Sequence, residues 1–208
     1  MTEENPLVYV VDDDASVRKA LGRLLRSGGY GVKTFASALE FIDNDPSGAP
    51  GCLVLDIKMP DLSGLELQEL LVGRGIFIPI VFITAHGTVP DSVKALKAGA
   101  MDFLEKPFKE HELLEAVSRG IEKHRILMRE NEQMKRLIGR LKTLTPRERE
   151  VFKLIVSGML NKQVAYDLGI TEKTVKVHRA QVMQKMKAES FADLVRFAEI
   201  LNIRSSIP

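Results

Sequence analysis

Cysteine and long hydrophobic runs are scarce in this sequence. Cys52 is the only cysteine among 208 residues, and it lies inside a short apolar run. A cysteine in such a run is best explained as a small buried hydrophobe in a reducing compartment. No apolar stretch approaches the roughly 18 residues that a membrane-spanning helix needs. Residues 1–6 contain neither the basic region nor the apolar region of a secretory signal. We therefore expect a cytoplasmic protein with no membrane partner.

Charge is divided unevenly along the chain, although the formal net charge is only +2. Residues 1–121 hold 12 Lys and Arg against 18 Asp and Glu, whereas residues 122–208 hold 18 Lys and Arg against 10 Asp and Glu. A chain of this length can form two domains, each with its own core. An acidic part followed by a basic part indicates two modules, of which the second binds a polyanion.

Short apolar runs alternate with amphipathic segments over the first 120 residues. Strands are expected at 7–11, 30–35, 52–55, 79–84 and 101–104, and helices near 15–28, 37–45, 64–73, 90–99 and from Lys109 onward. Wholly apolar runs of this length are typical of parallel strands that are covered on both faces. The repeat therefore predicts an α/β domain with a doubly wound, five-stranded parallel sheet.

Polar side chains stand where the expected strands end. Asp12 and Asp13 follow the first strand, Asp56 follows the third, Thr84 ends the fourth and Lys106 follows the fifth. The carboxyl ends of parallel strands share one edge of the sheet, so we expect these side chains to meet there. Three neighbouring carboxylates repel one another unless a cation neutralises them, and hard oxygen ligands suit Mg²⁺. Asp56 is then the candidate nucleophile for a phosphoryl group, with Lys106 and Thr84 placed to bind phosphoryl oxygens.

Helix capping is a simpler explanation for acidic residues in front of a helix that starts at Ala15. We assign that role to Asp14. Capping does not explain why Asp56, Thr84 and Lys106 also stand at strand ends.

The fifth helix has no obvious end in the sequence. Between residues 121 and 142 there is no proline and the only glycine is Gly139. Leu127, Met134 and Leu141 recur every seven residues in this segment. A solvated linker helix and a short parallel coiled coil explain this pattern equally well.

A second module starts with a helix-capping pattern. Thr145, Pro146 and Glu148 form a capping box with a favourable first helical residue. Further helices are expected at 161–168, 172–186 and 191–201, with Gly169 in the turn between the first two. A short helix, a tight turn and a longer basic helix are typical of the helix-turn-helix. We expect an all-α, four-helix DNA-binding domain.

One face of the helix at 172–186 is expected to enter the major groove of DNA. Val175, Val182 and Met186 share the opposite face, which should be core. The groove-facing side is basic but includes Val177, which can touch a thymine methyl group. The residues expected to contact DNA, within and beside the helix-turn-helix at 161–180, are Lys162, Gln163, Lys173, Thr174, Lys176, Val177, Arg179, Ala180 and Lys185. Of these, Lys162, Gln163, Arg179 and Lys185 are assigned to backbone phosphates.

The first module resembles the receiver domain of two-component response regulators. The resemblance is carried, in order and spacing, by Asp12-Asp13, Asp56-Ile57-Lys58-Met59-Pro60, Thr84-Ala85 and Lys106-Pro107-Phe108. It implies strand order 2-1-3-4-5 and phosphorylation of Asp56 by a sensor histidine kinase. It implies that Mg²⁺ is bound directly by Asp13 and Asp56, by the backbone carbonyl of Lys58, and by Asp12 largely through water.

The same resemblance assigns the remaining residues of this site. Thr84 and Phe103 match the family's switch pair, in which the hydroxyl moves toward the phosphate and the ring turns inward. Ala85 leaves the pocket open, and Lys106 binds the phosphate. The Lys106–Pro107 peptide bond is expected to be cis.

Residues 145–201 resemble the LuxR-type helix-turn-helix domain, and the whole chain resembles the NarL/FixJ class, closest to its FixJ-like branch. The expected division is a receiver domain at 6–121, a helical linker at 122–143 and a DNA-binding domain at 144–208. The resemblance implies a phosphorylation-dependent transcriptional regulator that forms a homodimer on phosphorylation. Its partners would be the kinase, double-stranded promoter DNA and RNA polymerase. Such a protein is not an enzyme, apart from its own phosphorylation and dephosphorylation.

Three other classes were weighed. An aspartate-based phosphatase needs a carboxylate two residues after the nucleophile as a general acid, and Lys58 occupies that position. A dinucleotide-binding enzyme is disfavoured because no G-x-G-x-x-G motif follows the first strand. A structural DNA-binding protein that never takes phosphate leaves the acidic strand ends unexplained.

Overall fold

The structure, a computed structural model, describes residues 5–44, 49–85 and 88–203. It divides into two compact units, one ending at Met128 and the other beginning at Arg129. His86, which follows Ala85 beside the expected phosphate site, lies outside the described residues.

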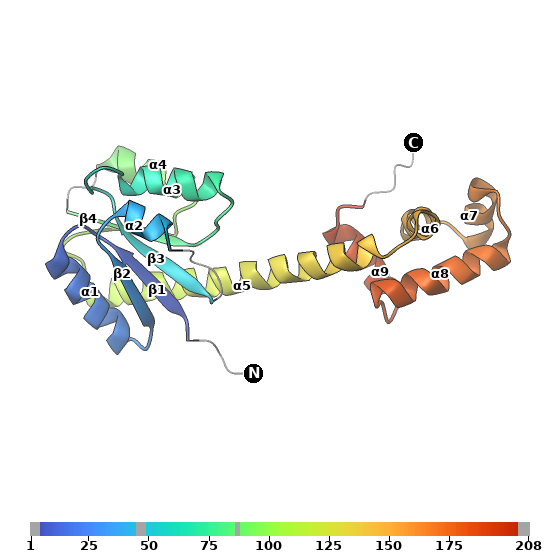
Figure 1. The fold of residues 1–208 in the computed structure, drawn as a ribbon, viewed down its shortest axis with the longest axis horizontal. Coiled ribbons are helices and arrows are strands. Elements are labelled where there is room, and N and C mark those ends of the chain that lie inside the picture. The colour runs from blue at the N-terminus through green and yellow to red at the C-terminus, as the bar shows by residue number, and fades with distance from the viewer. Residues whose placement is uncertain (1–4, 45–48, 86–87, 204–208) are drawn as a thin grey trace. The chain divides into compact units, whose positions relative to one another are not determined.

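The first unit is built on a parallel sheet of five strands (Figure 1). The strands are β1 (Leu7–Val11), β2 (Gly31–Phe35), β3 (Gly51–Asp56), β4 (Ile80–Thr84) and β5 (Asp102–Glu105). Their order is β2-β1-β3-β4-β5, and every neighbouring pair is parallel. The fold class and strand order expected from the sequence are confirmed.

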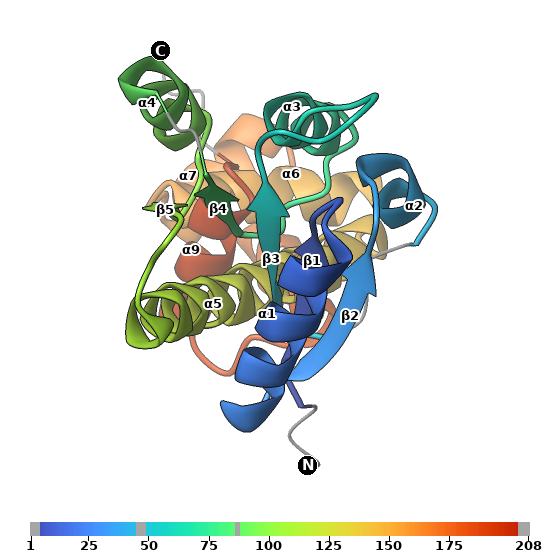
Figure 2. The same cartoon turned by 90° about the vertical axis from the view of Figure 1, so that its left-hand side faces the viewer.

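Helices cover both faces of the sheet (Figure 2). They are α1 (Ala15–Ser27), α2 (Ala38–Ile42), α3 (Gly64–Gly73), α4 (Val89–Lys97) and α5 (Glu110–Lys142). One core joins the sheet to α2, α3 and α4, and the other joins it to α1 and α5. Helix α2 is shorter than the expected 37–45, because its backbone leaves the helix after Ile42.

Strand register places the functional strand ends side by side. Val11 pairs with Leu55, so the residues that follow, Asp12 and Asp56, are neighbours. Asp56 pairs in turn with Ile83, one residue before Thr84. Gly64, at the start of α3, is required by close packing here, because a Cβ atom at this position would lie 2.3 Å from the Asp56 carbonyl oxygen. The edge expected to carry the chemistry is therefore tightly packed.

Helix α5 continues through the expected domain end at residue 121 and through most of the expected linker. Its last turns belong to the second unit. There Leu137 is buried, and Leu141 packs against the same core. Because Leu141 is one of the three heptad positions, its packing within the chain weighs against the coiled-coil alternative.

The second unit contains four further helices, as expected. They are α6 (Pro146–Val156), α7 (Asn161–Leu168), α8 (Glu172–Met186) and α9 (Phe191–Ile200). The capping box of Thr145 and Glu148 is present at the start of α6. Gly169 has φ of 63° in the turn between α7 and α8, a backbone conformation that glycine adopts without strain.

Candidate functional site

Asp12, Asp56 and Lys106 form an acidic pocket at the carboxyl edge of the sheet. The Lys106 Nζ atom donates to Asp12 Oδ2 at 2.7 Å and to Asp56 Oδ1 at 2.8 Å. Asp12 is 1% exposed and Asp56 is 6% exposed, so both carboxylates are buried. One ammonium group thus pairs with two buried carboxylates, so negative charge exceeds positive charge in this pocket.

Backbone groups hold the other carboxylate oxygens. The Asp14 N–H donates to Asp12 Oδ1, and the Lys58 N–H donates to Asp56 Oδ2, each at 2.8 Å. Arg18, from the second turn of α1, donates to the Asp12 carbonyl oxygen at 2.7 Å. Sequence reasoning missed Arg18, because a contact with a backbone carbonyl leaves no signal in the pattern of residue types.

Burial and the neighbouring charges together shift the pKa values of Asp56 and Lys106. Burial raises the pKa of Asp56, and the negative charge of Asp12 acts in the same direction, so the pKa stays raised although Lys106 opposes both. Burial by itself would lower the pKa of Lys106, but its hydrogen bonds to Asp12 and Asp56 and their charges outweigh burial and raise it. Lys106 is therefore a permanent cation beside a carboxylate whose ionisation is disfavoured.

Asp13 does not join the other two carboxylates. Its residue is exposed, and within residues 5–44, 49–85 and 88–203 no three His, Cys, Asp or Glu side chains are grouped to hold a metal ion. In this structure the cluster therefore holds two carboxylates, Asp12 and Asp56, and the part expected of Asp13 stays a prediction. Asp14 caps α1 as expected, since its side chain accepts from the N–H groups of Ser16 and Val17.

The remaining pocket residues lie on β4, on β5 and just beyond them. Thr84 is buried at 1% exposure, whereas the neighbouring Ala85 is exposed. Phe103 on β5 is partly buried against the core under α2, α3 and α4. The Lys106–Pro107 peptide bond is cis, as expected.

An apolar surface lies on α4, next to β5. The exposed fractions are 77% for Val89, 43% for Val93 and 49% for Leu96. Lys94 on the same helix pairs with Glu69 of α3 at 3.0 Å, in full solvent exposure. This pairing makes Lys94 less available to a partner.

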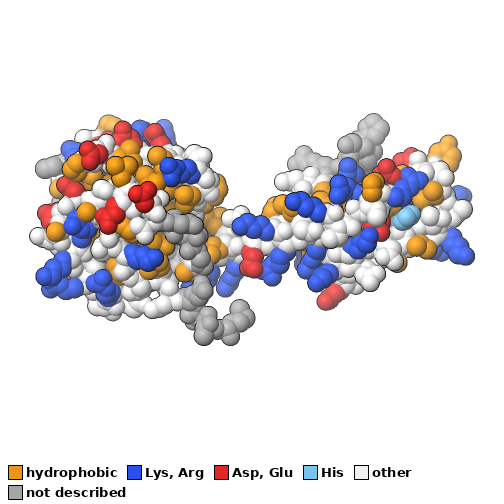
Figure 3. All heavy atoms as spheres, in the orientation of Figure 1, with side chains coloured by type: hydrophobic (Ala, Val, Ile, Leu, Met, Phe, Trp, Pro, Cys, Tyr) orange, Lys and Arg blue, Asp and Glu red, His pale blue; other side chains and the backbone are white. Residues whose placement is uncertain are grey.

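The helix α8 separates core and exposed residues as expected. Val175, Val182 and Met186 are fully buried. On the other side Lys173, Lys176, Val177 and Ala180 are exposed, with Val177 at 56%. On the face seen in Figure 3, the charged side chains of the second unit are more often Lys and Arg than Asp and Glu. This helix offers a basic surface with an apolar member.

Three other residues assigned to DNA have partners within the chain. Lys185 Nζ donates to both carboxylate oxygens of Glu148, at 2.9 and 2.7 Å, and is only 30% exposed. Because Glu148 holds the ammonium group, Lys185 is less available to a phosphate than the sequence indicates, and its assignment to DNA stays a prediction. Arg179 donates to Asn161 at 3.2 Å and lies over the Phe191 ring. Thr174 hydrogen-bonds the α8 cap, Thr171, at 2.9 Å.

Two more assigned residues lie on α7. Lys162 and Gln163 are both exposed. The Gln163 Oε1 atom accepts from the Leu160 N–H at 2.7 Å, which caps the start of α7. Among the described residues, no helix is long and apolar enough to cross a membrane.

Comparisons with known proteins match both units. The model of the response regulator receiver domain matches residues 8–118, and that of bacterial regulatory proteins of the luxR family matches residues 142–198. Nodulation protein W of Bradyrhizobium diazoefficiens is 46% identical over 200 residues, covering 96% of this chain and 88% of its own. Transcriptional regulatory protein FixJ of Rhizobium meliloti is 46% identical over 191 residues, covering 92% and 94%.

Solved structures agree with this result. The response regulator StyR superimposes with a TM-score of 0.84 at 48% identity, covering 94% of this chain and 99% of its own. Full-length FixJ from B. japonicum gives a TM-score of 0.57 at 38% identity, covering 95% and 97%.

Proposed function

Because the chain belongs to the NarL/FixJ class of response regulators, with a receiver domain and a LuxR-type DNA-binding domain, we propose that Asp56 accepts a phosphoryl group from a sensor histidine kinase. The class regulates transcription in a phosphorylation-dependent way. In this proposal the N–P bond at the kinase histidine breaks as an O–P bond forms at the Asp56 carboxylate.

The observation that carries the proposal is the Lys106 ammonium group between two buried carboxylates. A fixed cation next to the nucleophile stabilises the charge that spreads over phosphoryl oxygens during transfer. Burial raises the pKa of Asp56, and the neighbouring charge of Asp12 adds to this rise, while Lys106 opposes it. A carboxylate in that state gains from an additional cation, which would also neutralise charge on the phosphoryl oxygens of the acyl phosphate.

The donor set of the acidic pocket fits a divalent cation. Asp12 and Asp56 supply hard oxygen atoms, and within the described residues each of the four oxygens accepts one hydrogen bond. A carboxylate oxygen has two lone pairs, so each can accept a further partner. We propose that Mg²⁺ binds through Asp12, Asp13, Asp56 and the Lys58 carbonyl, where it would neutralise charge on the phosphoryl oxygens. The exposed Asp13 is free to turn toward the pocket when such a cation is present.

We propose that Thr84 and Phe103 transmit the modification to the α4 surface, with Ala85 leaving room for the phosphate. A phosphoryl group adds roughly −1.5 to −2 charges, which attract the Lys106 ammonium group and the Thr84 hydroxyl. Phe103, partly buried beside them, would then repack. The exposed Val93 and Leu96 provide the apolar part of a homodimer interface on this face.

In the same proposal a dimer presents two α8 helices to a roughly palindromic promoter site. Lys173, Lys176, Val177 and Ala180 face the bases and phosphates of the groove. Lys162, Gln163, Thr174 and Arg179 contact the backbone, and RNA polymerase is the further partner. Lys185 is the least available member of this set, because its ammonium group pairs with Glu148.

A phosphorylation experiment tests the site. Wild-type protein, Asp56→Asn and the matched control Asp14→Asn are incubated with acetyl phosphate, with and without Mg²⁺. Intact-mass and peptide mass spectrometry should show one phosphoryl group on Asp56 in the wild type and the control, only with Mg²⁺. Modification at Asp12 or Asp13, or full modification of Asp56→Asn, would falsify the assignment.

A further inference from the structure

The C-terminal end of α8 is held by residues from outside the helix-turn-helix. The last carbonyl groups of a helix have no partner within it. Arg140 Nη1 donates to the Met186 carbonyl oxygen, the last helical residue of α8, at 3.1 Å. A cation at this end also interacts favourably with the helix dipole. Lys187, which follows, has φ of 52° and ends the helix.

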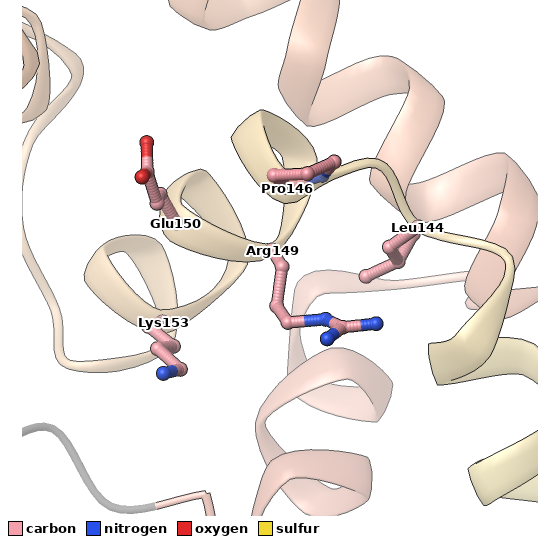
Figure 4. A pocket seen from close by; sticks show the side chains of 5 residues that line it. All are labelled: Leu144, Pro146, Arg149, Glu150 and Lys153. Carbon is pink, nitrogen blue, oxygen red and sulfur yellow. The ribbon is translucent and has the colours of Figure 1, made fainter.

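Arg140 comes from α5, and this part of α5 is firmly packed. Leu137, one turn earlier, is 2% exposed and belongs to the core that contains Val175 and Met186. Arg149 of α6 donates to the Leu141 carbonyl oxygen at 3.3 Å. Figure 4 shows the Arg149 side chain extending beneath Leu144, at one side of a pocket of about 250 Å³. The last turns of α5 are thus part of the DNA-binding unit, although the matched family model starts only at residue 142.

A second contact fixes the neighbouring residue of α8. Lys185 Nζ reaches both oxygens of Glu148, which is 5% exposed and also accepts from the Thr145 N–H at 2.8 Å. The burial of Glu148 fixes the position of Lys185, because moving Lys185 away would leave a buried carboxylate without its cation.

We propose that Arg140, assisted by the Lys185–Glu148 pair, is a positioning residue that sets the orientation of α8 for reading DNA; this rests on the proposed function of α8. The exposed residues that would meet the bases lie toward the other end of the helix. Lys176 lies ten residues from Met186, about 15 Å along the axis. A small tilt at the held end therefore displaces the reading residues, and direct readout needs accurate hydrogen-bond geometry. Phosphate contacts are less sensitive, because charge attraction has no such directional requirement.

The test separates selective from unselective binding. A duplex is selected from a random pool by the wild-type full-length protein, and a shuffled duplex of the same composition serves as the unselective probe. Dissociation constants for both are measured over a range of salt concentrations. The variants are Arg140→Ala and Arg140→Lys. Arg136→Ala is the matched control, because Arg136 lies one turn earlier on α5 and, within the part of the chain that the structure describes, pairs with Glu132 alone, at 2.8 Å.

We expect Arg140→Ala to weaken binding to the selected duplex about tenfold more than binding to the shuffled duplex, in line with the loss of one well-formed base contact. Arg136→Ala should weaken both equally and slightly. Arg140→Lys keeps the charge and one donor, so it should recover part of the selectivity. Hydrogen exchange should show the amides of α8 still protected in Arg140→Lys.

Two results would overturn the inference. Equal losses on both duplexes, with a salt slope reduced by about one, would make Arg140 a phosphate contact instead. Unchanged selectivity with lower protection of α8 would leave Arg140 a purely structural residue. A wild-type protein that selects no duplex would overturn the proposed function itself, which is a separate and recognisable outcome.

Discussion

Each unit of the molecule contains a buried lysine–carboxylate site, and the two sites differ in balance. In the first unit Lys106 faces both Asp12 and Asp56. In the second unit Lys185 faces Glu148 alone, which also receives the Thr145 N–H. Burial raises the pKa of both Asp56 and Glu148. The pKa of Asp56 stays above its usual value. The pKa of Glu148 falls below its usual value, because the hydrogen bonds from Lys185 and Thr145 outweigh burial.

This difference distinguishes the proposed phosphorylation site from a site that stabilises the fold. A paired and fully hydrogen-bonded carboxylate gains nothing from a further cation. A carboxylate whose charge is only partly compensated, and whose position its surroundings fix, is suited to binding a metal ion or to covalent modification. The charges are thus unbalanced at the carboxyl edge of the first unit's sheet and balanced in the second unit. Unbalanced buried charge is expected where residues are selected for function rather than for stability.

The largest effect should follow removal of the shared cation. Lys106→Met leaves two buried carboxylates without it, and we expect the first unit to lose about 3 kcal/mol of its free energy of unfolding. Saturating Mg²⁺ should restore more of this free energy in the variant than it adds to the wild type. Native-state hydrogen exchange at β1 and β3 measures both. If Mg²⁺ raised the free energy of unfolding equally in the wild type and in Lys106→Met, the metal ion and Lys106 would not neutralise the same carboxylate charge.

A smaller effect of opposite sign is expected from Asp56→Asn. This change removes one of the two like charges and keeps the shape of the side chain, so the first unit should become more stable by up to about 1 kcal/mol. The matched change Glu148→Gln should instead destabilise the second unit, because Lys185 loses its partner. Denaturant titration followed by hydrogen exchange in each unit gives both values. The comparison fails if both amide variants shift stability in the same direction.

The smallest effect is the pH dependence of the two carboxylates. Glu148 has a lowered pKa in the folded state, so its stabilisation is complete above its unfolded pKa and is lost as the pH falls below about 4.5. Asp56 has a raised pKa in the folded state, so it favours the folded state increasingly as the pH falls toward 3.8. Subtracting the pH profiles of Glu148→Gln and Asp56→Asn from that of the wild type isolates each group. If the free energy of unfolding changed with pH in the same direction for both groups, the charges of the two sites would not differ in balance as we describe.

The sequence by itself determined the fold and the place of the chemistry. Apolar runs predict the strands because a fully covered strand needs apolar residues on both faces, and the structure has all five within about a residue of their expected ends. The residue after a strand lies at the sheet edge whatever the later packing, so Asp56, Thr84 and Lys106 were predictable. Helical periodicity likewise separated Val175, Val182 and Met186 from the exposed face of α8.

Only the tertiary structure decided which charged groups are paired. Lys185 looks like any basic residue of a DNA-reading helix, and its assignment to Glu148 depends on how α6 packs against α8. Arg18 and Arg140 bind backbone carbonyls, which every residue has, so no residue type marks their partners. Leu141 fits a heptad pattern and a domain core equally well, and only its packing against the core that contains Leu137 weighs against the coiled coil. Periodicity reports which face of an element is buried, whereas partners across elements depend on distances that exist only once the elements have packed.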